Sequence, residues 1–387
     1  MRYMTAGESH GKGLTAVVDG FPAQMQVNQQ QINYYLSLRQ QGYGRGGRMK
    51  IETDQVEFLS GVRGGVTTGA PITLFIRNKD YENWLDYMNP ETIQPGREVT
   101  KPRPGHADLY GALKFGHKDI RNVLERASAR ETAVRVAVGA ICIQLLNTLG
   151  ITSLSHVTAL GGVQATGNYQ EEMFLQKVDA SPVRCGDEAA SQNMISAIDK
   201  AKQEGDSLGG VVQVVFQNLS PGIGSYTQWD QKLDARLAFA LMSIQSVKGV
   251  SFGMGFEGAY AFGSQVHDEI YYQPEQGFFK KTNRAGGIEG GMSNGQDIVI
   301  QIALKPIPTL YKPLKTADLI TGEPLTAAVE RSDTCAVPAA SIVAECTAAI
   351  ALCQSLCDQF GSGCLDDFSD RYRRFEKRMR QPISFFK

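Results

Sequence analysis

The chain has 387 residues, of which 42% are hydrophobic and 20% are charged, and its formal net charge at pH 7 is −1. A near-neutral total argues against a general nucleic-acid binder or a membrane-surface protein, because both carry a large excess of one sign of charge. The seven cysteines form no C-x-x-C pair, which favours buried reduced thiols, no structural metal and a cytoplasmic location. No apolar signal core begins the chain, and no uninterrupted apolar segment predicts a membrane span.

Apolar or alternating runs predict strands in the first quarter of the chain and again in its second half. Most of these runs are bounded by Gly or Pro, as strands usually are. The expected strands cover residues 14–18, 56–62, 72–76, 211–216, 250–256 and 298–307.

Apolar residues at helical spacing predict four helices. The first is polar and covers Asn28–Gln41, with Asn28 as a candidate N-cap. The others cover residues 129–149, 233–244 and 337–360, and the last is apolar on nearly all sides, which predicts burial between layers. The basic stretch Arg371–Arg380, within a C-terminal tail at 362–387, predicts a helix on the surface or at a subunit contact.

The order of these elements bears on the fold class. The strands fall into two groups with helices between and after them, whereas a doubly wound fold alternates strands and helices regularly. Neither a low-complexity linker nor a repeat of fixed period is present. The sequence therefore predicts one large mixed α+β domain over residues 1–387, with several Gly-rich loops.

The loop Gly7-Glu8-Ser9-His10-Gly11 has three interpretations. It matches the G-x-S-x-G elbow of serine hydrolases, in which Ser9 is the nucleophile, but that elbow needs a helix after the serine and a strand is predicted there. Alternatively, His10 is a general acid that hands a proton to a departing phosphate, since an unperturbed imidazole titrates near neutrality. The third interpretation is a structural histidine bonded to the backbone.

An acid-free stretch separates Asp19 from Glu52 and contains Arg39, Arg45 and Arg48. Arginines flanked by glycine suit bidentate capture of phosphate and carboxylate groups, and a solvated basic face is the plainer alternative. The same stretch matches the dinucleotide pattern G-x-G-x-x-G at residues 42–47, but the strand and helix that this pattern requires are not predicted around it.

A rigid segment, Lys101–Asp108, contains a second histidine, His106. Its two prolines stiffen the chain, and Gly105 permits a close approach of the backbone to another group. His106 is therefore either placed for chemistry or purely structural, and the local sequence is compatible with both.

The start of the long apolar helix combines a cap with positive charge. Ser128 is a candidate N-cap, and Glu131 follows it at the spacing of a capping box. Arg126 and Arg130 flank this helix start, where backbone N–H groups and positive side chains favour an anion. The structural and anion-binding interpretations are compatible.

Two later segments are candidates for ligand contact. A Gly-rich loop at 285–295 leads into a strand that ends at Lys305–Thr309, which suits a flat or phosphorylated ligand, although such turns are also common without one. Arg331 and Asp333 precede the last apolar helix. Arg331 is a candidate anion ligand, and Asp333 is a candidate capping or orienting group. A plain helix entry is the alternative.

Taken in order, seven segments resemble the chorismate synthase family. Each is weak alone, but seven in sequence order, reaching to about Pro338, are highly specific. They are G-E-S-H-G at 7–11, S-G-V-x-x-G-x-T-T-G at 60–69, R-P-G-H-A-D at 103–108, R-x-S-A-R-E-T at 126–132, V-K-G-V at 247–250, G-G-M-S-N-G-Q at 290–296 and R-S-D at 331–333.

The resemblance implies a reaction and an architecture. The family converts 5-enolpyruvylshikimate 3-phosphate into chorismate and phosphate by an anti 1,4-elimination, with reduced FMN as cofactor. Its members place helices between two antiparallel sheets, and they are usually homotetramers. In some members, NADPH reduces the flavin.

The resemblance also implies roles for individual residues. His10 is the acid toward the leaving phosphate, His106 protonates or neutralises the reduced flavin, and Asp333 assists proton removal. Ser9 and Ser128 hydrogen-bond within the same site. The positions implied for the substrate anions are Arg39, Arg45, Arg48 and Arg130, and Arg39 and Arg45 also match NADPH positions. The positions implied for FMN are Arg126, Ala127, Ser128, Gln245, Ser246, Gly290, Lys305, Pro306, Ile307, Pro308, Thr309 and Arg331. Ala127 replaces a frequent serine and Thr334 a frequent proline.

Overall fold

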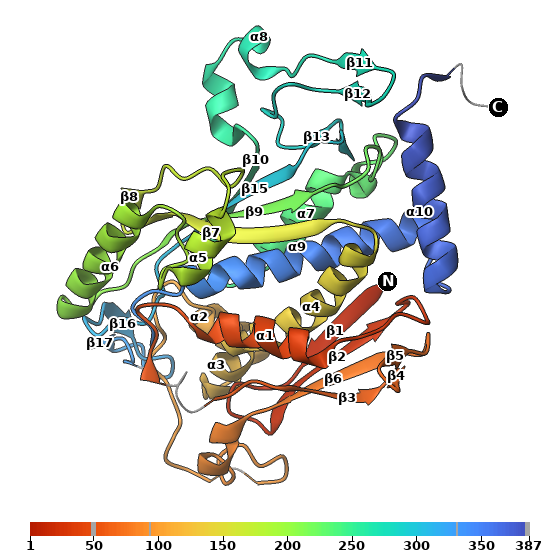
Figure 1. The fold of residues 1–387 in the computed structure, drawn as a ribbon. Helices are drawn as coiled ribbons and strands as arrows, with labels where there is room; N and C mark the ends of the chain where they lie inside the picture. Colours follow the sequence, from red (N-terminus) through yellow and green to blue (C-terminus); the bar gives the residue numbers. More distant parts are fainter. Residues whose placement is uncertain (48–51, 93, 330–331, 384–387) are drawn as a thin grey trace.

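The N-terminal sheet is antiparallel, with the strand order β1-β2-β6-β3 (Figure 1). The computed structural model describes residues 1–47, 52–92, 94–329 and 332–383. Alternate residues of the two central strands are buried, and the register pairs Leu14 with Ile76 and Val18 with Ile72. One face of the sheet therefore meets the core. The strands are β1 (Arg2–Ala6), β2 (Gly13–Asp19), β3 (Val56–Ser60) and β6 (Ile72–Arg77).

The second sheet has the order β10-β15-β9-β7-β8 and is also antiparallel. Its strands are β7 (Thr152–Leu160), β8 (Val163–Gln164), β9 (Gly210–Gln217), β10 (Val247–Phe252) and β15 (Ile298–Leu304). The predicted strand at 250–256 was wrong at its end, because Gly253 turns the chain with a φ of +55°. The strand predicted at 298–307 ends early because Pro306 and Pro308 have no N–H to donate.

Helices connect the two sheets, and the mixed α+β class is confirmed. Helix α4 packs on β2 and β6, helix α9 packs on β7 and β9, and the two helices pack against each other. One buried hydrophobic cluster contains residues from both sheets and from these helices. The predicted helices are α1 (Gln29–Gln40), α4 (Thr132–Thr148), α7 (Leu233–Met242), α9 (Val337–Phe360) and α10 (Leu365–Met379).

Helix α9 is buried along almost its whole length. Among the described residues it is the one helix long and apolar enough to span a membrane, but 89% of its apolar window is buried inside the protein. Such burial is typical of a core helix. The aromatic ring of Phe360, at its C-terminal end, packs edge-on against Phe368, Tyr372 and Phe375 of α10. The C-terminal tail is therefore helical over much of its length and anchored to the core.

The crossing of α4 and α9 depends on one glycine. A Cβ at Gly139 would lie 2.4 Å from both the Cβ and the carbonyl oxygen of Cys346. We expect Gly139→Ala to destabilise the fold by about 1–3 kcal/mol, because the added methyl forces two packed backbones apart. Urea unfolding would measure this. Gly363→Ala, where no atom lies within 4 Å, is the matched control, and equal stability of the two variants would contradict the expectation.

Several elements were not predicted, among them the strands β1 and β7 of the two main sheets. The missed helices are α2 (Asp108–Phe115), α3 (Arg121–Ala127), α5 (Phe174–Ala180), α6 (Glu188–Gln203) and α8 (Gly263–Val266). The small strand pairs are β4 (Val62–Arg63) with β5 (Val66–Thr67), β11 (Tyr271–Gln273) with β12 (Gly277–Phe279), β13 (Ile288–Glu289) with β14 (Met292–Ser293), and β16 (Lys315–Ala317) with β17 (Pro324–Thr326). Helices α2 and α3 matter most below, because they carry functional candidates.

Candidate active site

The loop Gly7–Gly11 joins β1 to β2, so the helix that a hydrolase elbow requires is absent and the elbow interpretation of Ser9 was wrong. Gly7 has a φ of +110°, and a Cβ there would lie 2.4 Å from the Gly13 carbonyl oxygen. The loop lies against α3, with the Ser9 N–H donating to the Glu125 carbonyl at 3.0 Å. The buried Ser9 hydroxyl donates to the Ser128 hydroxyl at 3.1 Å, which brings two candidate residues together.

His10 lies between a carboxylate and an aromatic ring. Its Nδ1 is 2.8 Å from Glu125 Oε1, and its backbone N–H donates to Glu125 Oε2 at 2.7 Å. The indole of Trp84 stacks on the imidazole with 4.1 Å between ring centroids. His10 Nε2 lies 3.9 Å from Asp80 Oδ2. The ring thus binds a carboxylate, where the structural interpretation of the sequence expected the backbone.

The acid-free stretch meets its counter-charges inside the protein. Arg130 Nη1 lies 2.6 Å from Asp54 Oδ1, and Arg39 Nη1 lies 3.3 Å from Asp54 Oδ2. Glu52 Oε2 lies 3.7 Å from Arg130 Nη2. All four side chains are buried, and burial lowers the pKa of Arg39 to about 9 despite the attraction of Asp54. The sequence did not predict this network, since both acids stand just beyond the stretch.

Arg45 and Asp333 meet although they lie far apart in the chain. Arg45 Nη1 is 3.3 Å from Asp333 Oδ2, and the Gly46 N–H donates to Asp333 Oδ1 at 2.6 Å. The backbone N–H of Thr334 donates to the Gly44 carbonyl at 2.8 Å. Gly-flanked Arg45 is thereby held beside the segment of the last predicted motif. The candidates Arg48 and Arg331 lie outside the described residues.

His106 forms a second histidine–carboxylate pair. Its Nδ1 hydrogen-bonds to Asp108, which also accepts from Arg103 Nε at 2.9 Å. Burial raises the pKa of Asp108, but the hydrogen bonds from His106 and Arg103 outweigh it and hold that pKa well below the ordinary value. Arg103 Nη1 donates to Thr309 Oγ1 at 2.8 Å, and Lys305 Nζ donates to the Gly105 carbonyl. The Lys305–Thr309 segment is therefore attached to the His106 loop.

Asp108 gives an expectation for stability against pH. A carboxyl whose pKa is lower when folded stabilises the fold above its unfolded pKa of ~3.9, and this contribution is lost as pH falls further. We therefore expect Asp108→Asn to be less stable than the parent at pH 7, and the difference to shrink below about pH 4. Thermal unfolding at pH 7 and pH 3 would measure it, with exposed Asp86→Asn as control at pH 7. A difference unchanged at pH 3 would contradict the assignment.

Glu131 links the N-terminal loop region to the segment that follows α7. Gln245 Nε2 donates to Glu131 Oε2 at 3.5 Å, and Thr5 Oγ1 donates to Glu131 Oε1 at 3.0 Å. Thr5 Oγ1 in turn accepts from Arg126 Nη2 at 2.8 Å. The Ser246 carbonyl accepts from the Lys305 N–H at 2.9 Å. Arg126, Gln245, Ser246 and Lys305 thus belong to one connected region.

The predicted capping box at Ser128 was wrong. The Ser128 hydroxyl accepts from the Arg130 N–H at 3.2 Å, so it does cap a single 3₁₀ turn at Ala129–Glu131 before α4. Glu131, however, bonds to Thr5 and to Arg135 and not back to the cap residue. The Glu131 side chain thus binds residues distant in the sequence or one turn along the helix, and the hydrogen bond of a capping box is not formed.

Gly290 is not brought to this region within the chain. It lies in the turn between β13 and β14, whose Gly291 carbonyl accepts from the Leu233 N–H at 2.8 Å. Leu233 begins α7, whereas Gln245 and Ser246 follow its end. Ten helical residues separate the two ends by roughly 15 Å at the rise of an α-helix.

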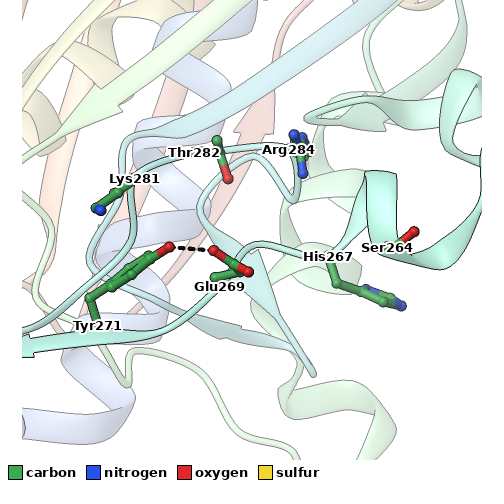
Figure 2. Close-up of a pocket in the computed structure, with 7 residues that line it drawn as sticks. All are labelled: Ser264, His267, Glu269, Tyr271, Lys281, Thr282 and Arg284. Carbon is green, nitrogen blue, oxygen red and sulfur yellow. Dashed lines mark hydrogen bonds between the residues drawn. The ribbon is translucent and has the colours of Figure 1, made fainter.

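A cavity near β11 has none of the predicted site residues in its lining. Figure 2 shows it with the hydroxyl of Tyr271 directed toward the carboxylate of Glu269. Lys281 Nζ lies 4.2 Å from the centroid of the Tyr271 ring. The cavity is lined by Ser264, His267, Glu269, Tyr271, Lys281, Thr282 and Arg284. Sequence reasoning assigned no role to these residues, and the candidate site does not include them.

Comparisons with known proteins agree with the motif order. The family model described as chorismate synthase matches residues 1–357. The chain belongs to the chorismate synthase family. It is 54% identical to a chorismate synthase of Caldicellulosiruptor bescii, with 97% of this chain and 99% of the relative covered. It is 52% identical to one of Geobacillus thermodenitrificans, with 98% and 100% covered.

A solved structure supports the family at the level of the fold. It is described as "Crystal Structure of Chorismate Synthase", has a TM-score of 0.79 and 39% identity, and 98% of each chain is covered. Chorismate synthases are carbon–oxygen lyases of the shikimate pathway, so the chain is an enzyme of that class and acts on a small molecule. The hydrolase alternative receives no support from these relatives.

The polar groups of this chorismate synthase site fit a phosphorylated flavin. Within the described chain, Gln245 Oε1 and Arg130 Nη2 are buried and make no hydrogen bond, so both have capacity for a ligand. Lys305 and Arg126 supply positive charge, and Thr309 supplies a hydroxyl. Ala127 offers no hydroxyl for such a contact. These donors and acceptors are the kinds that a phosphate and a flavin ring require.

Proposed function

We propose that this enzyme converts 5-enolpyruvylshikimate 3-phosphate into chorismate and phosphate by anti 1,4-elimination with reduced FMN. The observation that carries the proposal is the pair of histidine–carboxylate contacts, His10 with Glu125 and His106 with Asp108, in a chain of the chorismate synthase family. Such paired histidines suit proton transfer near neutral pH. Ser9 and Ser128 contribute hydroxyl hydrogen bonds beside His10.

In this proposal the arginines hold the three anionic groups of the substrate. Arg130 supports this role because its buried Nη2 has donor capacity, and Arg45 because it lies beside Asp333. Arg48 completes the set by family resemblance. Arg39 is buried against Asp54, so it contributes positive potential to the site and keeps the carboxylate and Arg130 in place.

The proton transfers are proposed to use different groups for the substrate and for the flavin. His10 donates a proton to the departing phosphate, while His106 protonates or neutralises the reduced flavin. Asp333 assists removal of the ring proton. Bound reduced FMN supplies electron density that eases loss of the phosphate, with no net redox change. The support is the separate carboxylate partner of each histidine and the contact of Asp333 with Arg45.

The proposed flavin site is formed by Arg126, Ala127, Ser128, Gln245, Ser246, Lys305, Pro306, Ile307, Pro308 and Thr309, with Gly290 and Arg331. The hydrogen bonds that join Thr309 and Lys305 to the His106 loop support this placement. Gly290, being distant in this chain, fits the proposal as a residue contributed to a neighbouring subunit. NADPH is proposed as a reductant of the flavin, in keeping with the resemblance at Arg39 and Arg45.

We further propose a cytoplasmic homotetramer whose subunit is a single domain over 1–387, with helices between two antiparallel sheets. The shared hydrophobic cluster supports the single domain. Apolar side chains in the segment between β10 and β11 are largely exposed, as expected of subunit contacts. Phe256 is 80% exposed, Tyr260 91% and Phe262 80%.

An anaerobic assay tests the function. The protein is mixed with reduced FMN and the enolpyruvyl substrate, and phosphate and chorismate are followed together. We expect equal amounts of both products, each dependent on reduced flavin. Absence of chorismate under every reducing condition would overturn the proposal. Labelling of Ser9 by an active-site phosphonate without flavin dependence would instead favour a hydrolase.

A further inference from the structure

Glu125 contacts the His10 loop through both its side chain and its backbone. Its side chain is only 2% exposed and projects from α3. Its two carboxylate oxygens meet the ring Nδ1 and the backbone N–H of His10, while its own carbonyl accepts from the Ser9 N–H. The sequence analysis assigned no role to this glutamate, although it directly precedes the motif at 126–132. One residue thus fixes both the backbone and the ring of the proposed acid.

The surroundings of His10 leave one edge of its ring for chemistry. The Nδ1 edge meets Glu125, and one face is covered by Trp84. Nε2 lies 3.9 Å from Asp80, which is beyond hydrogen-bond distance. On the other side of Glu125, Arg121 Nη1 lies 3.7 Å from Oε1, so a cation from the same helix also faces the carboxylate. Nε2 is therefore the ring nitrogen that makes no hydrogen bond to another described residue.

We propose that Glu125 is a positioning residue that keeps the Nδ1 proton on His10 and directs Nε2–H toward the leaving phosphate. A carboxylate only accepts hydrogen bonds, so the imidazole nitrogen facing it must carry a proton. In the step, the Nε2–H bond breaks and a phosphate O–H bond forms, which leaves neutral His10 protonated on Nδ1. The inference rests on the proposed function, and Glu125 itself does not touch the substrate.

The second histidine is also paired with a carboxylate. His106 places Nδ1 against Asp108, which is again buried and again paired with an arginine, Arg103. Unlike at His10, the arginine also meets the ring, with Arg103 Nη2 3.1 Å from Nδ1 and 3.4 Å from Nε2. A carboxylate partner fixes the tautomer and the ring direction, and its loss reduces activity even when the fold is kept.

Kinetics of Glu125→Gln test the inference. This change keeps the shape and removes the charge, and we expect kcat to fall at least ~10-fold while KM for the enolpyruvyl substrate changes less than about twofold. Glu57→Gln, an exposed glutamate on β3, is the matched control. In a His10→Ala background, Glu125→Gln should produce no further loss, because a residue that acts through His10 has nothing left to position.

The outcomes separate this inference from the proposed function. An inactive parent enzyme would overturn the function itself. An active parent with a normal Glu125→Gln variant, or with an equal loss in the His10→Ala background, would overturn the role of Glu125. Histidine ¹⁵N shifts give a readout independent of turnover, and the chain has five histidines to assign. Nδ1 of His10 should be protonated in the parent and shift in Glu125→Gln, and unchanged shifts would also overturn the role.

Discussion

Replacing Arg130 by Met is expected to destabilise the folded protein by about 3–5 kcal/mol, because it removes a buried cation from two buried carboxylates. Asp54 and Glu52 have fully buried side chains, and Arg130 lies 2.6 Å from Asp54 Oδ1 and 3.7 Å from Glu52 Oε2. Arg39 remains beside Asp54 but reaches it only at 3.3 Å and also bonds to Thr132. Urea unfolding, followed by the shift of the midpoint, measures the effect.

Two companion variants make the Arg130 experiment specific. Arg63→Met, at an exposed position on β4, should change stability by less than about 0.5 kcal/mol. Adding Asp54→Leu to Arg130→Met should restore part of the lost stability. Replacing both members of a buried ion pair by apolar side chains costs far less stability than removing only one of them. If Arg130→Met were as stable as Arg63→Met, the buried network would not hold this part of the fold.

Replacing His106 by Ala is expected to lower turnover at least ~100-fold, the usual loss when an acid–base group is removed. The effect should appear in kcat with saturating reduced FMN, because the Arg103–Thr309 and Lys305–Gly105 contacts that attach the flavin segment do not involve the imidazole. Anaerobic phosphate release measures it.

The control for His106 is another histidine outside the proposed site. His267 is exposed and lines the separate cavity near β11 (Figure 2). His267→Ala should keep turnover within about twofold of the parent. Near-normal turnover of His106→Ala would defeat the proposed role of that imidazole, while equal losses in both variants would point to a general effect on folding.

Periodic patterns in the sequence were sufficient for several long elements but missed others, including the nine-residue strand β7 and the sixteen-residue helix α6. Helix α9 was predicted over the residues it occupies. An Ala-rich apolar run as long as that between Val337 and Gly361 is too long for a strand and predicts a helix. Helix α6 was missed because part of its buried stripe consists of Ala190, Ser191 and Ala201, which give little apolar contrast. Asp187, whose side chain accepts from the Ala190 N–H, was the available signal.

The candidate site shows a similar division. His10, Ser9 and Ser128 were singled out from short local motifs, and their contacts lie close together in space. The carboxylate partner of His10 was not predicted, because Glu125 meets it only through tertiary folding, and the same holds for Asp54 and Arg130. Arg39 shows the same effect, since a charge pattern reports how many cations are present and not which of them are buried.

The place of α9 in the core bears on how the enzyme is made. This helix begins at Val337 and covers α4, β7 and β9, which are all synthesised much earlier. Until the ribosome releases it, the apolar faces of those elements have no cover, and contacts between distant segments form slowly. A premature stop codon before α9, far from His10 and His106 in the sequence, would therefore remove the centre of the core and with it the whole enzyme.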